Sequence, residues 1–159
     1  QEKEMENLEV MQKQIDSFIK DKGLSLSLQT KLTETGLLIT ISDRALFDSG
    51  SAVVKNDAIP LAREISKLIV SDPPREILVS GHTDNVPIST STFRSNWELS
   101  AIRSINFLNI ILENKKHNPI HFSAIGHGEY RPITDNKTEK GRQQNRRVEV
   151  LILPRELEL

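Results

Sequence analysis

The chain of 159 residues contains no cysteine, which excludes disulfides and thiolate zinc sites. Aromatic residues make up only 4% of the chain, too few for the base-stacking platforms of nucleic-acid-binding proteins. The net charge of −1 likewise gives no electrostatic basis for binding nucleic acid. No apolar run approaches the roughly 20 residues that span a bilayer, and no signal-peptide pattern opens the chain. What remains is the composition of an ordinary globular domain with 27% charged residues.

The amino-terminal segment has a clear helical pattern. Apolar residues recur at steps of three and four through residues 2–21, and Gly23 is a suitable stop signal. Periodicity leaves three alternatives open: a helix packed on its own domain, a mobile linker, or a dimer-forming helix. Strict alternation of leucine and serine over residues 24–28 then predicts a half-buried strand, which a turn at 33–36 pairs with the next strand as a hairpin.

The rest of the chain alternates strands and helices. We expect strands over 37–42, 77–81, 121–126 and 148–153, helices over 56–70 and 95–113, and a short helix over 138–144. This order predicts an α/β (α+β) two-layer sandwich, with a mixed β-sheet and helices packed on one face. The predicted organisation is a helix and linker over 1–36, a binding domain over 37–153 and a tail over 154–159.

The helix over 95–113 carries two different stripes. Ser95 and Glu98 have capping-box spacing at its start. Trp97, Ile105 and Leu108 recur at helical steps and are the expected core contacts. This assignment places Arg103 on a different face from the deepest core.

Polar residues suited to a charged ligand cluster around the third strand. Asp84 follows the apolar run 77–79, where ligands of α/β sheets usually bind. Asn96, Leu99 and Arg103 follow at steps of three and four, hence on one helix face. A carboxylate and a guanidinium together suit a ligand that carries an ammonium and a carboxylate. The alternatives are an Asp84 that caps its own turn and an Arg103 that is exposed or paired with a neighbouring glutamate.

Arg146 and Arg147 begin the last expected strand, where alternate residues share a face. Arg146 is therefore expected to face with Val148, and Arg147 with Glu149. The two arginines are either part of a solvated charge run, or one of them supports the site near Asp84.

The sequence gives little support for a catalytic site or a metal site. The region of Asp84 offers only His82, whereas catalytic zinc normally needs three protein ligands. No serine lies in the Gly-x-Ser-x-Gly elbow of a hydrolase. We therefore expect no enzyme activity, no metal and no cofactor.

Five ordered motifs resemble the OmpA-like peptidoglycan-binding domain over residues 37–153. They are Ala45-Leu46-Phe47, Gly81-His-Thr-Asp84, Asn96-x-x-Leu99-Ser100-x-x-Arg103, Gly126-x-Gly128-Glu129-x-x-Pro132 and Gly141-Arg142-x-x-Asn145-Arg146-Arg147-Val148-Glu149. Within this group the segments 46–52, 82–87 and 93–100 look most like the flagellar stator subunits of the MotB and MotS type. One departure is Ser104, where the family usually has alanine; a serine is not expected to disturb the site.

The resemblance implies noncatalytic binding of the peptidoglycan stem peptide, typically through meso-diaminopimelate. It implies that Asp84 takes the ammonium and Arg103 the carboxylate. Three further residues would line the pocket and two would be neighbours: Thr83, Asn96 and Leu99, then Phe47 and Arg146.

The stator resemblance also implies a setting for the whole protein. A single transmembrane helix is expected upstream of Gln1, with the domain on the extracytoplasmic or periplasmic face of the bacterial membrane. The implied partners are peptidoglycan, a MotA- or MotP-type channel subunit and a second copy in a homodimer. The alternatives are an OmpA- or Pal-like envelope tether without a motor role, a peptidoglycan-cleaving enzyme, and a dimerisation module built on 2–21.

Overall fold

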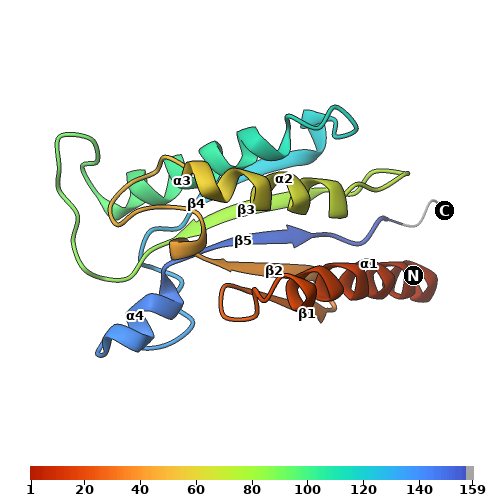
Figure 1. The fold of residues 1–159 in the computed structure, drawn as a ribbon, viewed down its shortest axis with the longest axis horizontal. Helices are drawn as coiled ribbons and strands as arrows, with labels where there is room; N and C mark the ends of the chain where they lie inside the picture. Colours follow the sequence, from red (N-terminus) through yellow and green to blue (C-terminus); the bar gives the residue numbers. More distant parts are fainter. Residues whose placement is uncertain (157–159) are drawn as a thin grey trace.

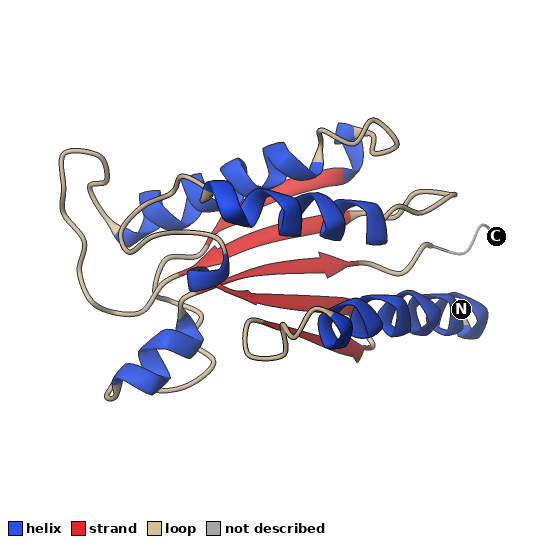
Figure 2. Cartoon of the chain, viewed as in Figure 1, coloured by secondary structure: helices blue, strands red, loops and turns tan. Residues whose placement is uncertain are grey.

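A computed structural model describes residues 1–156 of the chain. Five strands form one sheet in the order β1-β2-β5-β3-β4, and helices cover one face of it (Figures 1 and 2). Only β3 and β4 pair in parallel, so the sheet is mixed and the predicted fold class is confirmed. The strands are β1 (Leu28–Thr33), β2 (Gly36–Ser42), β3 (Ile77–His82), β4 (Phe122–Gly126) and β5 (Arg147–Ile152). The α-helices are α1 (Glu2–Asp21), α2 (Ile59–Leu68), α3 (Asn96–Ile111) and α4 (Glu139–Asn145).

Helix α1 has the predicted bounds and packs on the sheet of its own chain, over β1 and β2 (Figure 1). Its buried apolar stripe meets the alternating core residues of β2, because alternate strand residues share one face. The stripe is Leu8, Met11, Ile15 and Ile19, and its counterpart is Leu37, Ile39 and Ile41. Among residues 1–156, no helix combines the length and apolar character that crossing a bilayer demands.

The first strand begins later than its sequence pattern predicts. Residues 24–28 form a turn in which the amides of Ser27 and Leu28 both donate to Leu24 O, and Leu26 is 99% exposed. The chain must reverse after Gly23, at φ 65°, to reach the sheet edge, and the turn overrides the local alternation. The predicted hairpin is present, with Thr33 opposite Gly36.

Helix α3 buries a different stripe from the predicted one. Trp97 is 51% and Ile105 42% exposed, whereas Leu99, Arg103 and Phe107 are buried. The prediction that Arg103 lies away from the core is therefore wrong.

Two glycines explain this orientation of α3. A Cβ at Gly81 would lie 2.1 Å from Ser100 O, and one at Gly126 would lie 2.6 Å from Ala101 Cα. The helix therefore sits against the backbone of β3 and β4 through small residues. Ser104 secures this contact by donating to Ile125 O at 2.7 Å.

The start of α3 also differs in detail from the capping-box prediction. Ser95 occupies the N-cap position but makes no side-chain cap. The Glu98 carboxylate instead accepts from Arg94 N and Arg94 Nε, both at 2.7 Å. The helix start is thus tied to the preceding loop, which carries the residues after Asp84.

Candidate functional site

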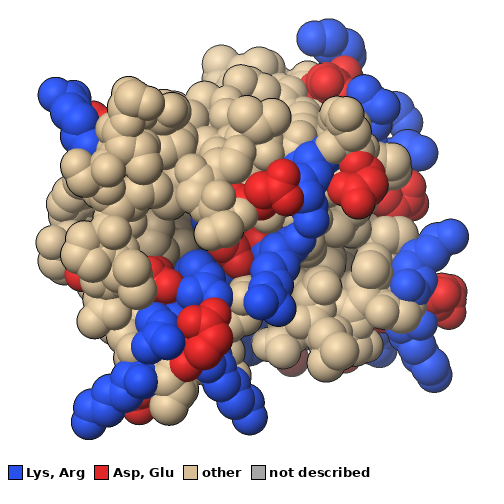
Figure 3. Space-filling view, turned by 60° about the vertical axis from the view of Figure 1, so that its left-hand side comes forward, with Lys and Arg blue, Asp and Glu red and all other residues tan. Residues whose placement is uncertain are grey.

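All seven predicted site residues line one open cavity of about 740 Å³. It lies where β2 and β3 end, between the start of α3, the loop that follows β2, the loop that follows β3, and α4. In Figure 3, which brings this end of the molecule forward, acidic and basic side chains lie side by side. The predicted residues in the lining are Phe47, Thr83, Asp84, Asn96, Leu99, Arg103 and Arg146.

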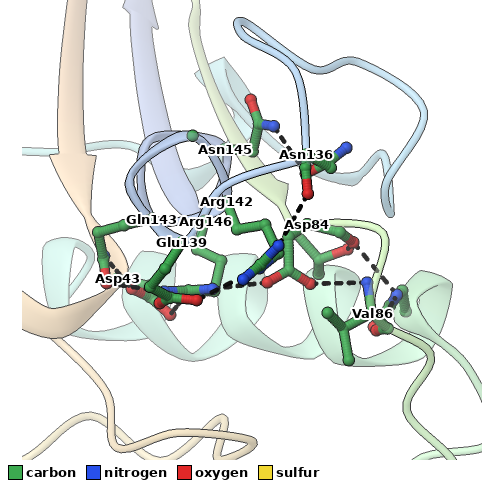
Figure 4. Close-up of polar contacts among 12 residues, drawn as sticks. Asp43, Asp84, Val86, Asn136, Glu139, Arg142, Gln143, Asn145 and Arg146 are labelled. Atoms are coloured by element: carbon green, nitrogen blue, oxygen red, sulfur yellow. Dashed lines mark hydrogen bonds and ion pairs between the residues drawn. The ribbon is translucent and has the colours of Figure 1, made fainter.

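Asp84 is buried and uses its two carboxylate oxygens differently. Oδ1 accepts from Val86 N at 3.0 Å, which is the turn-capping role left open by the sequence. Oδ2 accepts from Arg146 Nη1 at 2.6 Å (Figure 4). The carboxylate is therefore held in position by the backbone on one side and occupied by a cation on the other.

Arg103 is only 3% exposed, and each of its three nitrogens donates to a protein oxygen. Nη1 pairs with Asp43 Oδ2 at 3.2 Å, while Nε and Nη2 reach Ser51 O at 2.8 Å and Asp48 O at 3.2 Å. The guanidinium carbon also lies 4.7 Å from the centroid of the Phe47 ring, a cation–π contact. Burial outweighs the opposing Asp43 charge and lowers the pKa of Arg103, but an arginine stays protonated in proteins.

Arg146 bridges the acidic residues of the cavity. Its guanidinium donates to Asp84 Oδ2 and to Glu139 Oε1, both at 2.6 Å, and its Nε lies 3.8 Å from Asp43 Oδ2 (Figure 4). Burial alone would lower the pKa of Arg146, but the hydrogen bonds to Glu139 and Asp84 raise it. Its side chain is 21% exposed, so this shared cation faces solvent, unlike Arg103.

The remaining predicted residues shape the loops of the cavity. Thr83 N donates to Gly128 O at 2.9 Å, and Asn96 Nδ2 donates to Val86 O at 3.1 Å. Leu99 packs in a small apolar cluster with Phe93, which belongs to the loop between β3 and α3. These contacts position the chain on both sides of Asp84.

Four residues that line the cavity were not predicted as site residues from the sequence: Asp43, Glu139, Arg142 and Gln143. Asp43 is the most consequential, because its buried carboxylate contacts Arg103, Arg146 and Gln143. A signal for it was present in the sequence. Asp43 directly follows β2, and Asp84 closely follows β3. Both strands pair antiparallel with β5 and therefore run in the same direction, so their carboxyl ends meet at one edge of the sheet.

Arg147 and Glu149 share a face as their alternation predicts, but Arg146 is the C-cap of α4 and precedes the last strand. Arg147 pairs with Glu149 at 2.9 Å on the other face of the sheet, and Arg146 reaches the cavity. The preceding Asn145 is buried and holds the loop before α4. Its Oδ1 accepts from Ile133 N and Thr134 N, at 2.8 and 3.1 Å.

The cavity offers paired charges rather than metal ligands. Within residues 1–156, no three acidic or histidine side chains gather closely enough to hold a metal ion. The Asp84 carboxylate can exchange Arg146 for a ligand's ammonium, and Arg103 keeps N–H groups with which it can donate to a ligand's carboxylate.

The fold and its charged edge define an OmpA-like α/β sandwich. The chain belongs to the OmpA family, whose model matches residues 46–146. Motility protein B of Bacillus subtilis (strain 168) is 55% identical over 152 residues, which are 96% of this chain and 58% of that relative. The chain therefore spans little more than half the length of this relative.

Solved structures agree with this assignment. A MotB-like protein from Desulfovibrio vulgaris has a TM-score of 0.86 at 25% identity, over 97% of this chain and 98% of that one. The cell wall anchor of the T6SS from Pseudomonas aeruginosa has a TM-score of 0.78 at 29% identity, over 87% and 96% of the two chains. The family resemblance predicted from the five motifs is confirmed.

Proposed function

We propose that this chain is the peptidoglycan-binding part of a flagellar motor stator subunit, and that it anchors an ion-channel complex to the cell wall so that the complex can generate torque. The 55% identity to Motility protein B over nearly the whole chain supports the motor assignment. The observation that carries the binding function is the cavity in which Asp84 and two arginines meet. The domain binds and does not cleave its ligand.

The proposed ligand is the diaminopimelate of the stem peptide, which presents an ammonium and a carboxylate on one carbon. Asp84 accepts the ammonium in place of Arg146. The displacement leaves Arg146 paired, because Glu139 and Asp43 remain beside it. Arg103 donates to the ligand carboxylate: an arginine has five N–H groups, of which three are engaged here.

The setting of the whole protein belongs to the same proposal. The binding domain, residues 37–153, lies outside the cytoplasmic membrane, and residues 1–36, whose α1 and β1 pack on its sheet, lead toward a transmembrane helix. That helix joins a MotA-type channel subunit, and the subunit acts as a homodimer. The support is the longer relative, of which this chain covers 58%.

Sedimentation with purified diaminopimelate-type peptidoglycan tests the binding function. Asp84→Asn leaves the ligand ammonium unpaired, and Arg103→Lys keeps the charge but loses the planar set of donors, so each is expected to weaken binding about tenfold or more. The matched control is Asp21→Asn, the same change at an exposed carboxylate at the end of α1. If both site variants sediment like the control, the assignment is wrong. Fragments released from the wall during incubation would indicate an enzyme instead.

A second candidate is an envelope tether without a motor role, which the similarity to the T6SS cell wall anchor favours. Sedimentation cannot separate the two functions, because both predict wall binding. Swimming in soft agar can. The full-length gene is expected to restore motility to a stator-deleted strain, and its Asp84→Asn variant is not. Wall binding without any restored motility would favour the tether.

A further inference from the structure

The only tryptophan and the only tyrosine of the chain stack on one another at the surface. The rings of Trp97 and Tyr130 have centroids 4.9 Å apart and planes inclined by 25°. Both are about half exposed, at 51% and 54%. Large aromatic surfaces left in water in this way often mark a binding site. We call this pair the aromatic platform.

The aromatic platform is held rigidly beside the cavity. Gly128, at φ 61°, forms a tight turn in which Tyr130 N donates to His127 O. The turn is tied on both sides: Gly128 N donates to Ser100 Oγ of α3, and Gly128 O accepts from Thr83 N in the cavity wall. Trp97 itself follows the cavity residue Asn96 on α3. Trp97 and Tyr130 are not among the residues that line the cavity, but the platform adjoins the cavity wall through Asn96 and Thr83.

We propose that the aromatic platform binds a pyranose ring of the glycan strand while the cavity holds the stem peptide. This inference rests on the proposed peptidoglycan-binding function and adds a second subsite to it. The C–H face of a pyranose ring is apolar and slightly positive, which complements the negative face of an aromatic ring. Because the platform is already ordered by the turn, little conformational freedom is lost on binding.

Neighbouring polar groups suit the rim of a sugar. Glu129 and Arg131 flank Tyr130 in sequence, and neither is buried. Hydroxyl and acetamide groups at the edge of the ring can contact these side chains or remain in water. The platform thus contacts the glycan and contributes affinity. The charged cavity contacts the stem peptide and determines which peptide binds.

Intrinsic fluorescence reads this site directly, because Trp97 is the only tryptophan. The probes are a β-1,4-linked N-acetylglucosamine tetramer, glycan strands freed of peptide by an amidase, and the free stem peptide. We expect both saccharides to shift the Trp97 emission and to bind saturably. Tyr130→Ala is expected to weaken saccharide binding roughly fivefold to tenfold, the scale of an aromatic stacking contact. Calorimetry extends the test to Trp97→Ala, with Trp97→Phe expected to retain most of the affinity.

The controls separate this inference from the proposed function. Asp84→Asn is expected to lose the stem peptide and to keep the saccharides, while Tyr130→Ala does the reverse. If the stem peptide binds but neither saccharide perturbs Trp97 or binds by calorimetry, the platform is not a glycan subsite and the proposed function stands. If saccharide affinity is equal in the wild type, Tyr130→Ala and Trp97→Ala, all folded by circular dichroism, the sugar binds elsewhere and the inference is overturned.

Discussion

Two buried arginine–carboxylate clusters of this domain differ in how their arginines are shared. In the first, Glu4 of α1 accepts from Arg75 Nε and Arg155 Nη2, both at 2.7 Å. In the second, the cavity, Asp43 pairs with the buried Arg103, while Arg146 is shared among Asp84, Glu139 and Asp43. We refer to them as the Glu4 cluster and the cavity cluster.

The comparison separates a holding role from an exchangeable one. The Glu4 cluster joins α1 to segments before β3 and after β5, and both of its arginines depend on one carboxylate. The cavity cluster combines an equally buried pair, Asp43 and Arg103, with a solvent-facing arginine that has alternative partners. A cation with several carboxylate partners can leave one of them at little cost, whereas the buried Arg75 has only Glu4 among the carboxylates of residues 1–156 and cannot.

The largest effect is expected from breaking the Glu4 cluster. Glu4→Ala leaves the buried Arg75 without its carboxylate, and removal of one partner of a buried pair costs about 3–5 kcal/mol. The measurement is the free energy of unfolding in urea. Glu2→Ala, on the exposed first turn of the same helix, is the control and is expected to change stability by less than about 0.5 kcal/mol. Equal stability of the two variants would show that the cluster does not hold α1.

A slightly smaller loss is expected from Asp43→Asn, which keeps the shape of the side chain and removes its charge. Arg103 then loses its paired carboxylate but keeps its bonds to Ser51 O and Asp48 O, so we expect a loss of about 3 kcal/mol. Wall sedimentation is expected to weaken as well, because Arg103 is no longer held in place. An unchanged free energy of unfolding would show that the Asp43–Arg103 ion pair does not stabilise the fold.

Acid is expected to weaken the Glu4 cluster within a defined pH range. Burial raises the pKa of Glu4, but hydrogen bonds from Arg75 and Arg155 outweigh it and lower the pKa from 4.5 to about 2. Because the folded-state pKa is depressed, this stabilisation is complete above pH 4.5 and is lost as the pH falls toward 2.

The stability difference between the wild type and Glu4→Gln is therefore expected to shrink over this pH range. Unfolding in urea at several pH values measures it, with Glu2→Gln expected to run parallel to the wild type. Glu149 contributes acid sensitivity to both proteins alike: burial raises its pKa, but His82 and Arg147 lower it to about 2. A constant difference between the wild type and Glu4→Gln would contradict the depressed pKa.

The smallest change in stability is expected from Arg146→Ala. A partly exposed ion pair contributes roughly 0–1 kcal/mol, and the carboxylates around Arg146 reach solvent or other donors. The variant sharpens the comparison through binding instead. With Asp84 no longer occupied, Nα-acetyl-lysine amide, which offers an ammonium without a carboxylate, is expected to bind more tightly than to the wild type. Equal or weaker binding in calorimetry would show that Arg146 does not compete with the ligand.

Local patterns were sufficient where local forces dominate. The bounds of α1 followed from its apolar period and from Gly23, and both are present in the structure. The same reasoning failed for residues 24–28, because a reversal of the chain was needed there to reach the sheet. It failed again for the buried stripe of α3, because the close approach to Gly81 and Gly126 depends on elements distant in sequence.

By itself, the sequence determined the element types and the shared helix face of Asn96, Leu99 and Arg103, since helical spacing alone places them together. It also determined that Arg147 and Glu149 share a face, because alternate residues of a strand point to the same side of the sheet. Only the tertiary structure decided which charges meet. Asp43 reaches Arg103 across 60 positions of sequence, and Arg146 reaches Asp84 across 62. Such pairings depend on which strand ends share an edge of the sheet, and sheet order is set by packing of the whole domain.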